Sequence, residues 1–429
     1  MEELLFGVKE MGGVELSEVI EAYYHCRRRK RTTVNAMEFE MYWERECLSL
    51  WEEINNGTYR PGRSIAFIVN KPVKREIFAA DFRDRVVHHL IADKITAMLE
   101  KQFIDDSYST REGKGTSYGI QRIAKQMAEV SRNYTQDCYL MKVDIEGFFM
   151  AINKRQLYQE AEDFIKAHYN GADRELLLWL MRLTVENRPE KNCVRKTPPS
   201  SWRGLPRRKS LFGTDGTVGL PIGNLTSQLL ALLHLDPLDH LVTEEWKVDG
   251  YGRYVDDMIL IDHSKEKLLD IRGKIDSWLK SHGHQLHRRK FYIQHYQKGV
   301  AFIGGMIRPG RILMGHRSLA FWLQSLHGYN MRLEQQGYAD LDLACHFVAS
   351  MNSYLGLAQQ FMGYNIVHRI IAAISPQWFE VIQVIGRNGR YKIKLKRKYN
   401  VRRAERAAQK FPRFPASHHQ APARFKIHA

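Results

Sequence analysis

Two adjacent aspartates inside a strand-forming run constrain the fold of this chain more than any other feature. Residues 252–263 read GRYVDDMILIDH, so that Asp256 and Asp257 lie between apolar residues. Side chains alternate across a strand, and a continuous strand would send the two carboxylates to opposite faces. A hairpin turn at the pair would let both approach one site. We therefore predict a hairpin whose two carboxylates repel each other unless a cation lies between them.

A solvated hairpin tip is the simpler interpretation of an Asp-Asp pair, but its apolar flanks favour a metal site. Mg²⁺ takes several oxygen ligands, so a third carboxylate should exist. It is found at Asp144, near the end of the strand-like run CYLMKVDIEGFFM at residues 138–150. Two strands that bring three carboxylates to one point are typical of two-metal nucleotidyl transfer. The pattern predicts two Mg²⁺ ions, with Mn²⁺ as a substitute.

The length and cysteine content limit the class of protein. A chain of 429 residues is too long for one compact core, and we expect two or three lobes. No run of about 20 apolar residues occurs, and the first ten residues, MEELLFGVKE, lack the pattern of a secretion signal. We expect a cytoplasmic protein without a membrane partner. The five cysteines are scattered and predict neither a disulfide framework nor a zinc site.

Positive charge is concentrated near the two ends of the sequence. The net charge is +17, and residues 386–429 hold fourteen Lys or Arg and one Glu. A second basic cluster, RRRKR, occupies residues 27–31. Such runs suit nucleic-acid phosphates, although a solvated face or a tail that aids solubility is about as good an explanation. Residues 391–398 alternate like a strand, and we expect the tail from residue 386 to hold structured RNA.

The hydrophobic pattern predicts many helices and a few short strands. We expect two helices within residues 1–60, with Ser17 capping the first and a capping box of Asn35 and Glu38 starting the second. Further helices are predicted at 84–99, 153–169, 175–183, 229–235 and 265–281, and strands at 64–69, 75–80, 286–296 and 300–307. Residues 317–385 read as about three helices, whereas 185–218 lose periodicity and read as a functional or mobile loop.

Several loops carry groups that could bind nucleotides. The turn before the strand at 75–80 holds Lys71, Lys74 and Arg75, which could grip a triphosphate or be ordinary surface charges. Residues 107–119, SYSTREGKGTSYG, lack the spacing of a Walker loop, but could run past a template strand. The turn GLPIGNLTSQ at 219–228 ends at Gln228, which could reach a base pair or sugar, although helix capping explains most of this turn.

Taken in order, these motifs resemble the motif series of reverse transcriptases over about residues 71–357. The resemblance implies an α+β, right-hand polymerase with an antiparallel palm sheet. On this basis we expect an N-terminal helical extension at 1–60, fingers at 61–135, a palm at 136–310, a helical thumb at 311–385 and a basic tail at 386–429.

The resemblance also implies roles for individual residues. Asp144, Asp256 and Asp257 match the catalytic metal ligands, and Lys290, in LHRRKFYI, matches the general acid that protonates pyrophosphate. Phe149 matches the steric gate against a ribose 2′-hydroxyl. Lys74, Arg75 and Arg111 match triphosphate contacts, with Gln228 beside the incoming nucleotide. The primer grip corresponds to Phe302, Ile303 and Gly304, in the stretch KGVAFIGG.

One departure from the family pattern indicates a subgroup. Group II intron and retroviral enzymes usually have Pro-Gln-Gly before the YxDD hairpin, whereas this chain has LPIGNLTSQ. That variant, with MNSYLGL at 351–357, resembles the bacterial reverse transcriptases of diversity-generating retroelements and some phage-defence enzymes. The resemblance implies an RNA template, a DNA or RNA primer, dNTPs, and a small basic accessory protein or a noncoding RNA. A defence polymerase and an inactive RNA-binding scaffold are the alternatives.

Overall fold

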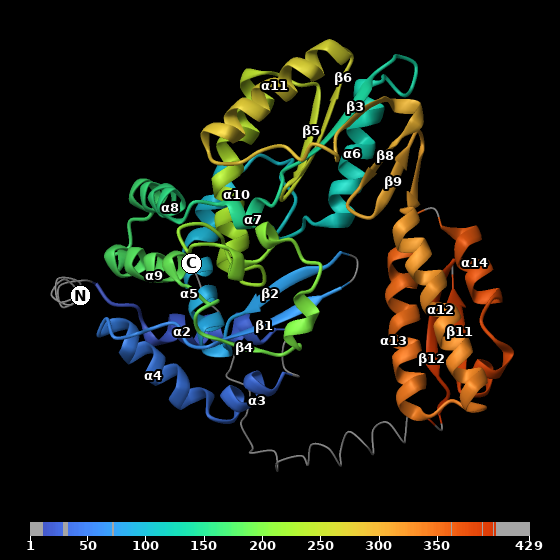
Figure 1. Ribbon diagram of the computed structural model, residues 1–429, viewed down its shortest axis with the longest axis horizontal. Coiled ribbons are helices and arrows are strands. Elements are labelled where there is room, and N and C mark those ends of the chain that lie inside the picture. Colours follow the sequence, from blue (N-terminus) through green and yellow to red (C-terminus); the bar gives the residue numbers. More distant parts are fainter. Residues whose placement is uncertain are drawn as a thin grey trace, which may run out of the picture. The chain divides into compact units, whose positions relative to one another are not determined.

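The computed structural model describes residues 12–28, 33–70, 73–361, 363–387, 389–397 and 399 (Figure 1). They form two compact units. The first runs up to Ile303 and includes Ile307–Arg311, and the second contains Gly304–Met306 and the residues from Ile312 onward. Within these ranges, no helix is both long and apolar enough to span a membrane.

Three helices, rather than the two predicted, begin the described chain: α2 (Leu16–Arg27), α3 (Val34–Met41) and α4 (Trp43–Asn55). The second predicted helix is broken at Tyr42, whose φ of −132° is not helical. Both predicted caps are wrong: Glu15 forms a capping box with Glu18, and Thr33 precedes α3. The broken pair folds back so that Trp43 stacks on Tyr23 with ring centroids 5.4 Å apart.

A small sheet follows, with strand order β2–β1–β4. The two predicted strands are present as β1 (Ser64–Val69) and β2 (Arg75–Ala79), and they pair as an antiparallel hairpin. β4 (Cys193–Arg195), from the stretch without periodicity, adds to β1 in parallel. The long helix α5 (Phe82–Gln102) begins at Asp81, whose carboxylate accepts a hydrogen bond from the Arg83 amide.

The main sheet of the first unit has the order β5–β6–β3–β7, with antiparallel neighbours. Its strands are β3 (Tyr139–Asp144), β5 (Gly250–Tyr254), β6 (Asp257–Asp262) and β7 (Tyr292–His295). The helices α6 (Thr116–Val130) and α11 (Lys265–Ser281) pack against β5 and β6. The strand predicted at 286–296 is shorter than expected, because residues 288–290 form a turn.

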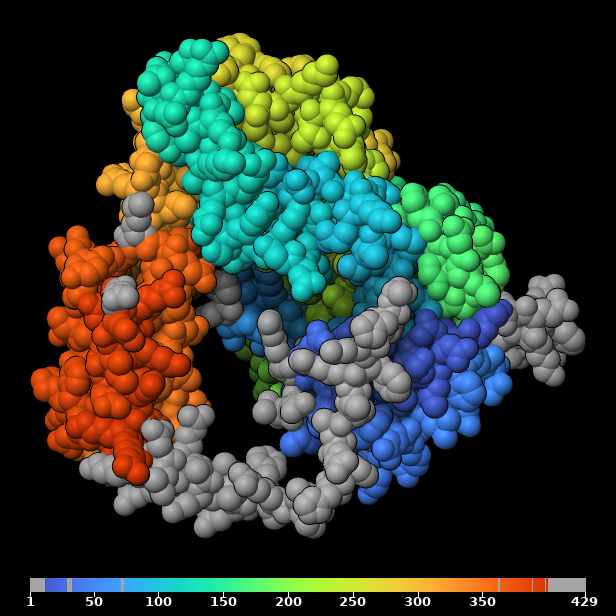
Figure 2. All heavy atoms as spheres, turned by 180° about the vertical axis from the view of Figure 1, so that it is seen from behind, coloured from blue at the N-terminus to red at the C-terminus, as the bar shows by residue number. Residues whose placement is uncertain are grey.

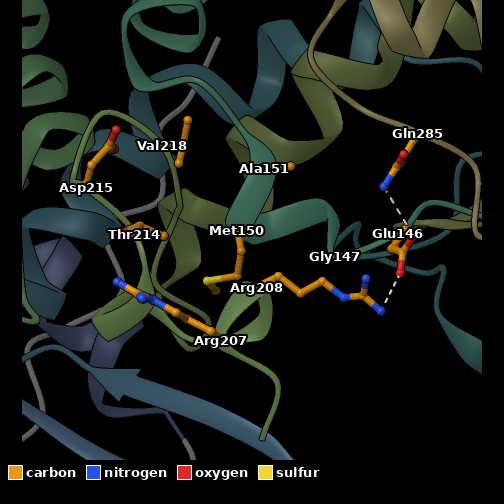
Figure 3. A pocket seen from close by; sticks show the side chains of 11 residues that line it. Glu146, Gly147, Met150, Ala151, Arg207, Arg208, Thr214, Asp215, Val218 and Gln285 are labelled. Atoms are coloured by element: carbon orange, nitrogen blue, oxygen red, sulfur yellow. Dashed lines mark hydrogen bonds and ion pairs between the residues drawn. The ribbon is translucent and has the colours of Figure 1, made fainter.

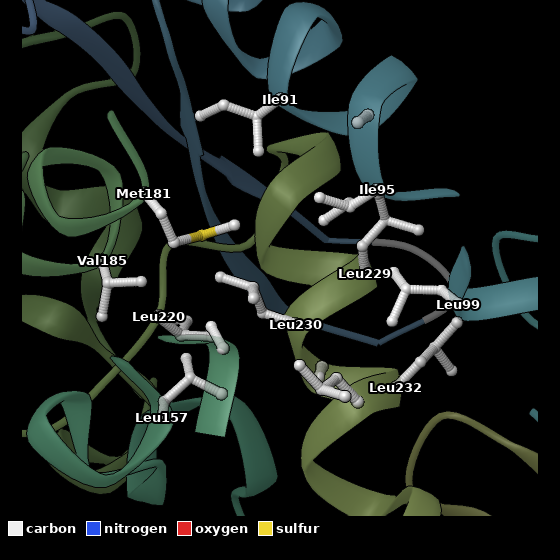
Figure 4. Packing of buried hydrophobic residues seen from close by; sticks show 14 of the residues in the cluster. Ile91, Ile95, Leu99, Leu157, Met181, Val185, Leu220, Leu229, Leu230 and Leu232 are labelled. Atoms are coloured by element: carbon white, nitrogen blue, oxygen red, sulfur yellow. The ribbon is translucent and has the colours of Figure 1, made fainter. Parts of the chain in front are cut away.

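The helix α10 (Leu225–His240) runs through the core of the first unit and is buried on nearly every side. Its leucines meet α5, α8 (Lys154–His168) and α9 (Arg174–Glu186), as Figure 4 shows for Leu229, Leu230 and Leu232. A helix that is apolar all round requires burial on all sides. α10 is therefore the element on which the sheet and the outer helices are assembled.

The second unit contains α12 (His316–Gln336), α13 (Leu341–Ala358) and α14 (Tyr364–Ala372), which confirms three helices. The helical prediction is wrong from residue 382, where β11 (Ile382–Arg387) forms an antiparallel hairpin with β12 (Arg390–Leu395). This hairpin crosses the predicted boundary at residue 386. Phe347 and Trp378 stack with centroids 4.0 Å apart inside this unit. Figure 2 shows the outer face of its residues in orange and red. A further sheet has the order β10–β9–β8, from Val300–Phe302 (β8), Gly305–Arg308 (β9) and Arg311–Met314 (β10).

Candidate active site

The three predicted carboxylates lie together at one end of the main sheet. Asp144 ends β3, and its Cα is paired in register with that of Asp257, the first residue of β6. Asp256 lies in the turn between β5 and β6, and its carbonyl accepts a hydrogen bond of 3.1 Å from the Ile145 amide. The predicted hairpin at the aspartate pair is therefore present, and an antiparallel neighbour brings the distant Asp144 to it.

The turn that carries Asp256 has an uncommon backbone and a buried support. Val255, the first of its two turn residues, has a φ of 58°, a conformation that glycine usually adopts in this kind of turn. Arg253 donates from Nη1 to the Val255 carbonyl at 3.1 Å. The same guanidinium binds Asp239 of α10 at 2.7 and 2.5 Å, and both side chains of this pair are fully buried. The hairpin is thus fixed to the core helix through Arg253.

Two lysines neutralise part of the negative charge. Lys290 donates to both oxygens of Asp144 at 2.8 Å, and Lys142 donates to Asp257 at 3.3 Å and to the Ala301 carbonyl at 3.1 Å. Burial, with the charges of Asp144 and Asp257, raises the pKa of Asp256 to about 6. Burial also raises the pKa of Asp257, although Lys142 opposes this. The charged form of Asp256 is therefore disfavoured despite the two lysines.

The carboxylates of Asp144, Asp256 and Asp257 are candidate ligands for a divalent metal ion. Among the described residues, no group of three or more His, Cys, Asp or Glu side chains is arranged to hold a metal ion. The three carboxylates nevertheless offer only hard oxygen donors, which suit Mg²⁺ or Mn²⁺ rather than zinc. The raised pKa of Asp256 indicates that a further cation would be favourable here. The chemistry of the residues fits such a metal, provided that Lys290 leaves Asp144.

The predicted gate residue lies immediately after the first carboxylate. Gly147, at φ 61°, turns the chain from β3 into the short helix α7 (Phe148–Ala151). Phe149 is half-buried in α7, and its carbonyl accepts a hydrogen bond of 2.8 Å from the Leu220 amide of the predicted GLPIGNLTSQ turn. The structure therefore joins the segment after Asp144 to that turn.

A buried histidine pair that the sequence analysis missed lies behind α7. His234 of α10 and His284 approach through their Nε2 atoms at 2.8 Å, and His234 Nδ1 lies 2.7 Å from Glu160 of α8. The Phe148 ring is 5.3 Å from that of His284. The carbonyl of the next residue, Gln285, accepts a hydrogen bond from the Glu146 amide, and the His287 amide donates to the backbone carbonyl of Asp144. The sequence does hold one signal for this pair: His234 lies in the apolar run LLALLHL, where a polar side chain is expected to need a buried partner.

The loop between β4 and α10 is attached to the β1–β2 hairpin by a buried acid. Glu76 of β2 accepts hydrogen bonds of 2.6 Å from Trp202 Nε1, Ser210 Oγ and the Leu211 amide. Lys74 donates at 2.5 Å to the carbonyl of Arg203 in the same loop, so its ammonium is engaged here. Arg75 is exposed at the start of β2, and Lys71 lies outside the described residues.

A cavity of about 460 Å³ borders the segment after Asp144 (Figure 3). Arg208 reaches Glu146 at 2.8 Å, and Gln285 donates to the same carboxylate at 3.2 Å. Arg207 and Asp215 also line the cavity. Its two arginines are balanced by Glu146 and Asp215, so the lining has no net charge that would attract a triphosphate.

Arg111, a predicted triphosphate contact, is buried in an ion pair in this structure. Its side chain is only 3% exposed and binds Glu100 of α5 at 2.7 Å. Its Nη1 donates to the carbonyls of Ile104 and Ser107. An arginine held in this way closes the loop 104–115 upon itself, and we assign it a structural role. Gln228, in contrast, is exposed on α10 and accepts a hydrogen bond from the Thr110 hydroxyl at 2.8 Å.

The predicted primer grip is divided between buried and exposed groups. Phe302 is 1% exposed, and its ring lies 6.4 Å from that of Tyr108, so its side chain belongs to the core and cannot contact a primer here. Ile303 and Gly304 form the turn between β8 and β9, with φ of 37° and 96°. Of these three, only the two turn residues have exposed backbone or side-chain atoms.

A comparison with known protein families identifies one family that matches this chain. A family model described as "Reverse transcriptase (RNA-dependent DNA polymerase)" matches residues 70–307, more than half of the chain. No curated protein sequence matches.

Similar solved structures are telomerases of two yeasts. The apo telomerase of Candida tropicalis truncated from the C-terminal domain is 14% identical with a TM-score of 0.42, over 58% of this chain and 55% of that one. The telomerase of Candida albicans with a fragment of telomeric RNA is 12% identical (TM-score 0.43; 73% and 55%). A further apo form from Candida tropicalis is 13% identical (TM-score 0.43; 79% and 61%). The chain thus covers less than two thirds of each of these proteins.

Proposed function

This chain belongs to the reverse transcriptase (RNA-dependent DNA polymerase) family, and from that premise we propose that it copies an RNA template into cDNA at the three-carboxylate site. The observation that carries the proposal is the pairing of Asp144 with Asp257 in the antiparallel β3–β6 ladder. With Asp256 in the adjoining turn, three acids from two distant segments converge within the family-matched region. Under this proposal the first unit holds fingers and palm, and helices α12–α14 form the thumb.

The roles of the side chains follow from their chemistry. Asp144, Asp256 and Asp257 would hold two Mg²⁺ or Mn²⁺ ions, which when bound supply Lewis acidity to the primer 3′-hydroxyl and the α-phosphate. Lys290 donates a proton to the leaving pyrophosphate once it is released from Asp144. Lys142 stays with Asp257 and limits the repulsion between the acids.

The substrate contacts complete the proposal. Phe149 occupies the volume of a ribose 2′-hydroxyl and so selects dNTPs. The exposed Arg75, together with Lys74 after it leaves the Arg203 carbonyl, binds the triphosphate through charge-assisted hydrogen bonds. Gln228 contacts the incoming nucleotide or its base pair, and the turn at Ile303 and Gly304 supports the primer. A cytoplasmic location would suit these substrates.

A primer-extension assay tests the polymerase itself. The purified full chain should extend a DNA or RNA primer on an RNA template with dNTPs and Mg²⁺, and the Asp256→Asn variant should not. Addition without template, or equal activity of Asp256→Asn, would contradict the proposal. An extension rate that is identical with and without RNA template would also contradict it.

The LPIGNLTSQ turn favours a role like that of the diversity-generating retroelement enzymes. We expect cDNA with substitutions concentrated at adenines of the template, made with a small basic accessory protein. The second candidate is an antiviral enzyme that copies a dedicated noncoding RNA. Sequencing cDNA made on a generic RNA separates the two: adenine-directed errors support diversification, whereas activity only on one co-purifying RNA supports defence.

A further inference from the structure

The hairpin β11–β12 in the second unit has two unlike faces. Residues alternate along both strands, and Ile382, Ile393 and Leu395 are buried on the inner face. The outer face carries the exposed Gln383, Ile385, Arg387, Arg390, Lys392 and Lys394. In the register, Arg387 is opposite Arg390, and Ile385 is opposite Lys392. The cations therefore form one ladder along the outside of a two-stranded ribbon.

The positive charge of this ladder is not balanced locally. Residues 382–399 contain no Asp or Glu. Among the described residues, none of the ion pairs involves Arg387, Arg390, Lys392 or Lys394. Most exposed lysines on α11, in contrast, pair with an acid one turn away, as Lys274 does with Asp270 and Lys280 with Asp276. Unbalanced cations on one face attract a polyanion, and this charge complementarity indicates the partner.

The ribbon is fixed on its helices by polar contacts. Asn352 of α13 donates to the Ile393 carbonyl at 2.7 Å and accepts from the Ile393 amide at 2.8 Å. Gln359 donates to the Tyr391 carbonyl at 2.7 Å. The Tyr391 hydroxyl lies 2.7 Å from His368 of α14. The edge of β12 that β11 leaves free is thereby covered, so this edge does not recruit a further strand. The outer face of the hairpin stays exposed.

The side chains of the outer face select among polyanions. The outer face holds no aromatic ring, and stacking on aromatic rings is the usual means of holding single-stranded bases. Alternate residues of a strand are about 7 Å apart, so the cations are spaced to meet successive phosphates of one backbone. Double-stranded RNA is recognised through its phosphates and 2′-hydroxyls rather than through its bases.

We propose that the outer face of the β11–β12 hairpin binds the sugar-phosphate backbone of an RNA duplex. The hairpin lies outside the family-matched residues 70–307 and contains none of the residues that the proposed function assigns to nucleotide addition. It would let the protein hold a folded RNA independently of nucleotide addition. Failure of this proposal can be distinguished from failure of the proposed polymerase function, because duplex binding is measured without dNTPs and nucleotide addition is measured separately.

The test compares two triple variants of the full chain. Arg390→Gln, Lys392→Gln and Lys394→Gln together remove three charges from the ladder, and Lys166→Gln, Lys274→Gln and Lys280→Gln remove three exposed charges elsewhere. Binding of an RNA duplex of roughly 16 base pairs is followed by fluorescence anisotropy over a range of salt concentrations. The ladder variant should weaken binding at least about tenfold and reduce the salt slope by about one per phosphate contact removed, whereas the control should not.

A variant that adds a positive charge to the ladder is a second, independent test. Ile385 is exposed beside Lys392, so Ile385→Lys should tighten duplex binding and steepen its salt dependence. The proposal would be overturned if the salt slope of duplex binding were unchanged in both the triple Gln variant of the ladder and Ile385→Lys. It would also be overturned if the control triple variant lost as much affinity for the duplex as the ladder variant. Tighter binding to single-stranded RNA, to a DNA duplex or to phosphatidylserine vesicles than to the RNA duplex would overturn the choice of partner. Primer extension at saturating template should remain unchanged in the ladder variant.

Discussion

The ammonium group of Lys290 lies 2.8 Å from both carboxylate oxygens of Asp144. If Lys290 donates a proton to pyrophosphate, Lys290→Gln should lower the single-turnover rate of nucleotide addition about 100-fold. Lys290→Arg keeps the charge but holds its proton far more firmly, so it should be nearly as slow. A wild-type rate in Lys290→Arg would show that Lys290 only neutralises Asp144.

Replacing Asp256 should separate activity from stability. Burial and two neighbouring carboxylates raise the pKa of Asp256 to about 6, so its charged form is unfavourable in the folded chain near neutral pH. Asp256→Asn should reduce primer extension roughly a thousandfold, while the unfolding midpoint without divalent ions stays the same or rises. Asp262→Asn, at the other end of β6, is the control and should retain activity. A large fall in the midpoint of Asp256→Asn would contradict this account.

Substitution of Phe149 tests sugar selection. Phe149→Ala opens the volume that would exclude a 2′-hydroxyl, so the ratio of ribonucleotide to deoxynucleotide incorporation should rise by about tenfold or more. The ratio is measured from kcat/KM for one rNTP and its matching dNTP. Phe148→Leu changes the neighbouring buried ring and should leave the ratio unaltered. If the ratio does not change in Phe149→Ala, another residue is the gate.

Arg111 should matter for folding rather than for triphosphate binding. Its buried guanidinium is bonded to Glu100 and to two carbonyls, so Arg111→Gln should lower the free energy of unfolding by about 3 kcal/mol, near the lower end for a buried pair because Glu100 is partly exposed. Denaturant unfolding measures this loss. The KM for dNTPs of the folded variant should equal that of the wild type, and a raised KM with unchanged stability would restore the triphosphate contact.

The buried histidine pair should make the protein sensitive to acid. Burial and the nearby His234 and His282 lower the pKa of His284 to about 3, whereas an unfolded histidine titrates near 6.5. The unfolded state therefore binds the extra proton between these values, and the free energy of unfolding should fall as the pH falls, by up to about 1.4 kcal/mol per pH unit. His284→Asn should flatten this dependence between pH 6.5 and 4. An identical slope in the variant would contradict the assignment.

The sequence was sufficient for features that depend on local pattern. The aspartate hairpin, the helix at 265–281 and the β1–β2 strands follow from periodicity and turn residues, and all three are present. Asp144 was found because an acid near the end of an apolar run is conspicuous.

Features that depend on tertiary partners were not predictable in this way. Arg111 looked like a free loop cation, because nothing local indicates that Glu100 of α5 will bind it. Phe302 lies in a motif-like stretch, yet its burial depends on Tyr108 from nearly two hundred residues earlier. Glu76 reads as one more charge on a hairpin, and only the fold brings Trp202, Ser210 and Leu211 to it.

The backbone conformation of Val255 lowers the stability of the fold. A β-branched residue at φ 58° costs on the order of 1–3 kcal/mol, and glycine would adopt the same conformation with little strain. A population screened only for resistance to heat would therefore tend to lose this valine. The strained residue is next to Asp256, so this cost in stability is located at the candidate active site, where backbone strain is commonly found.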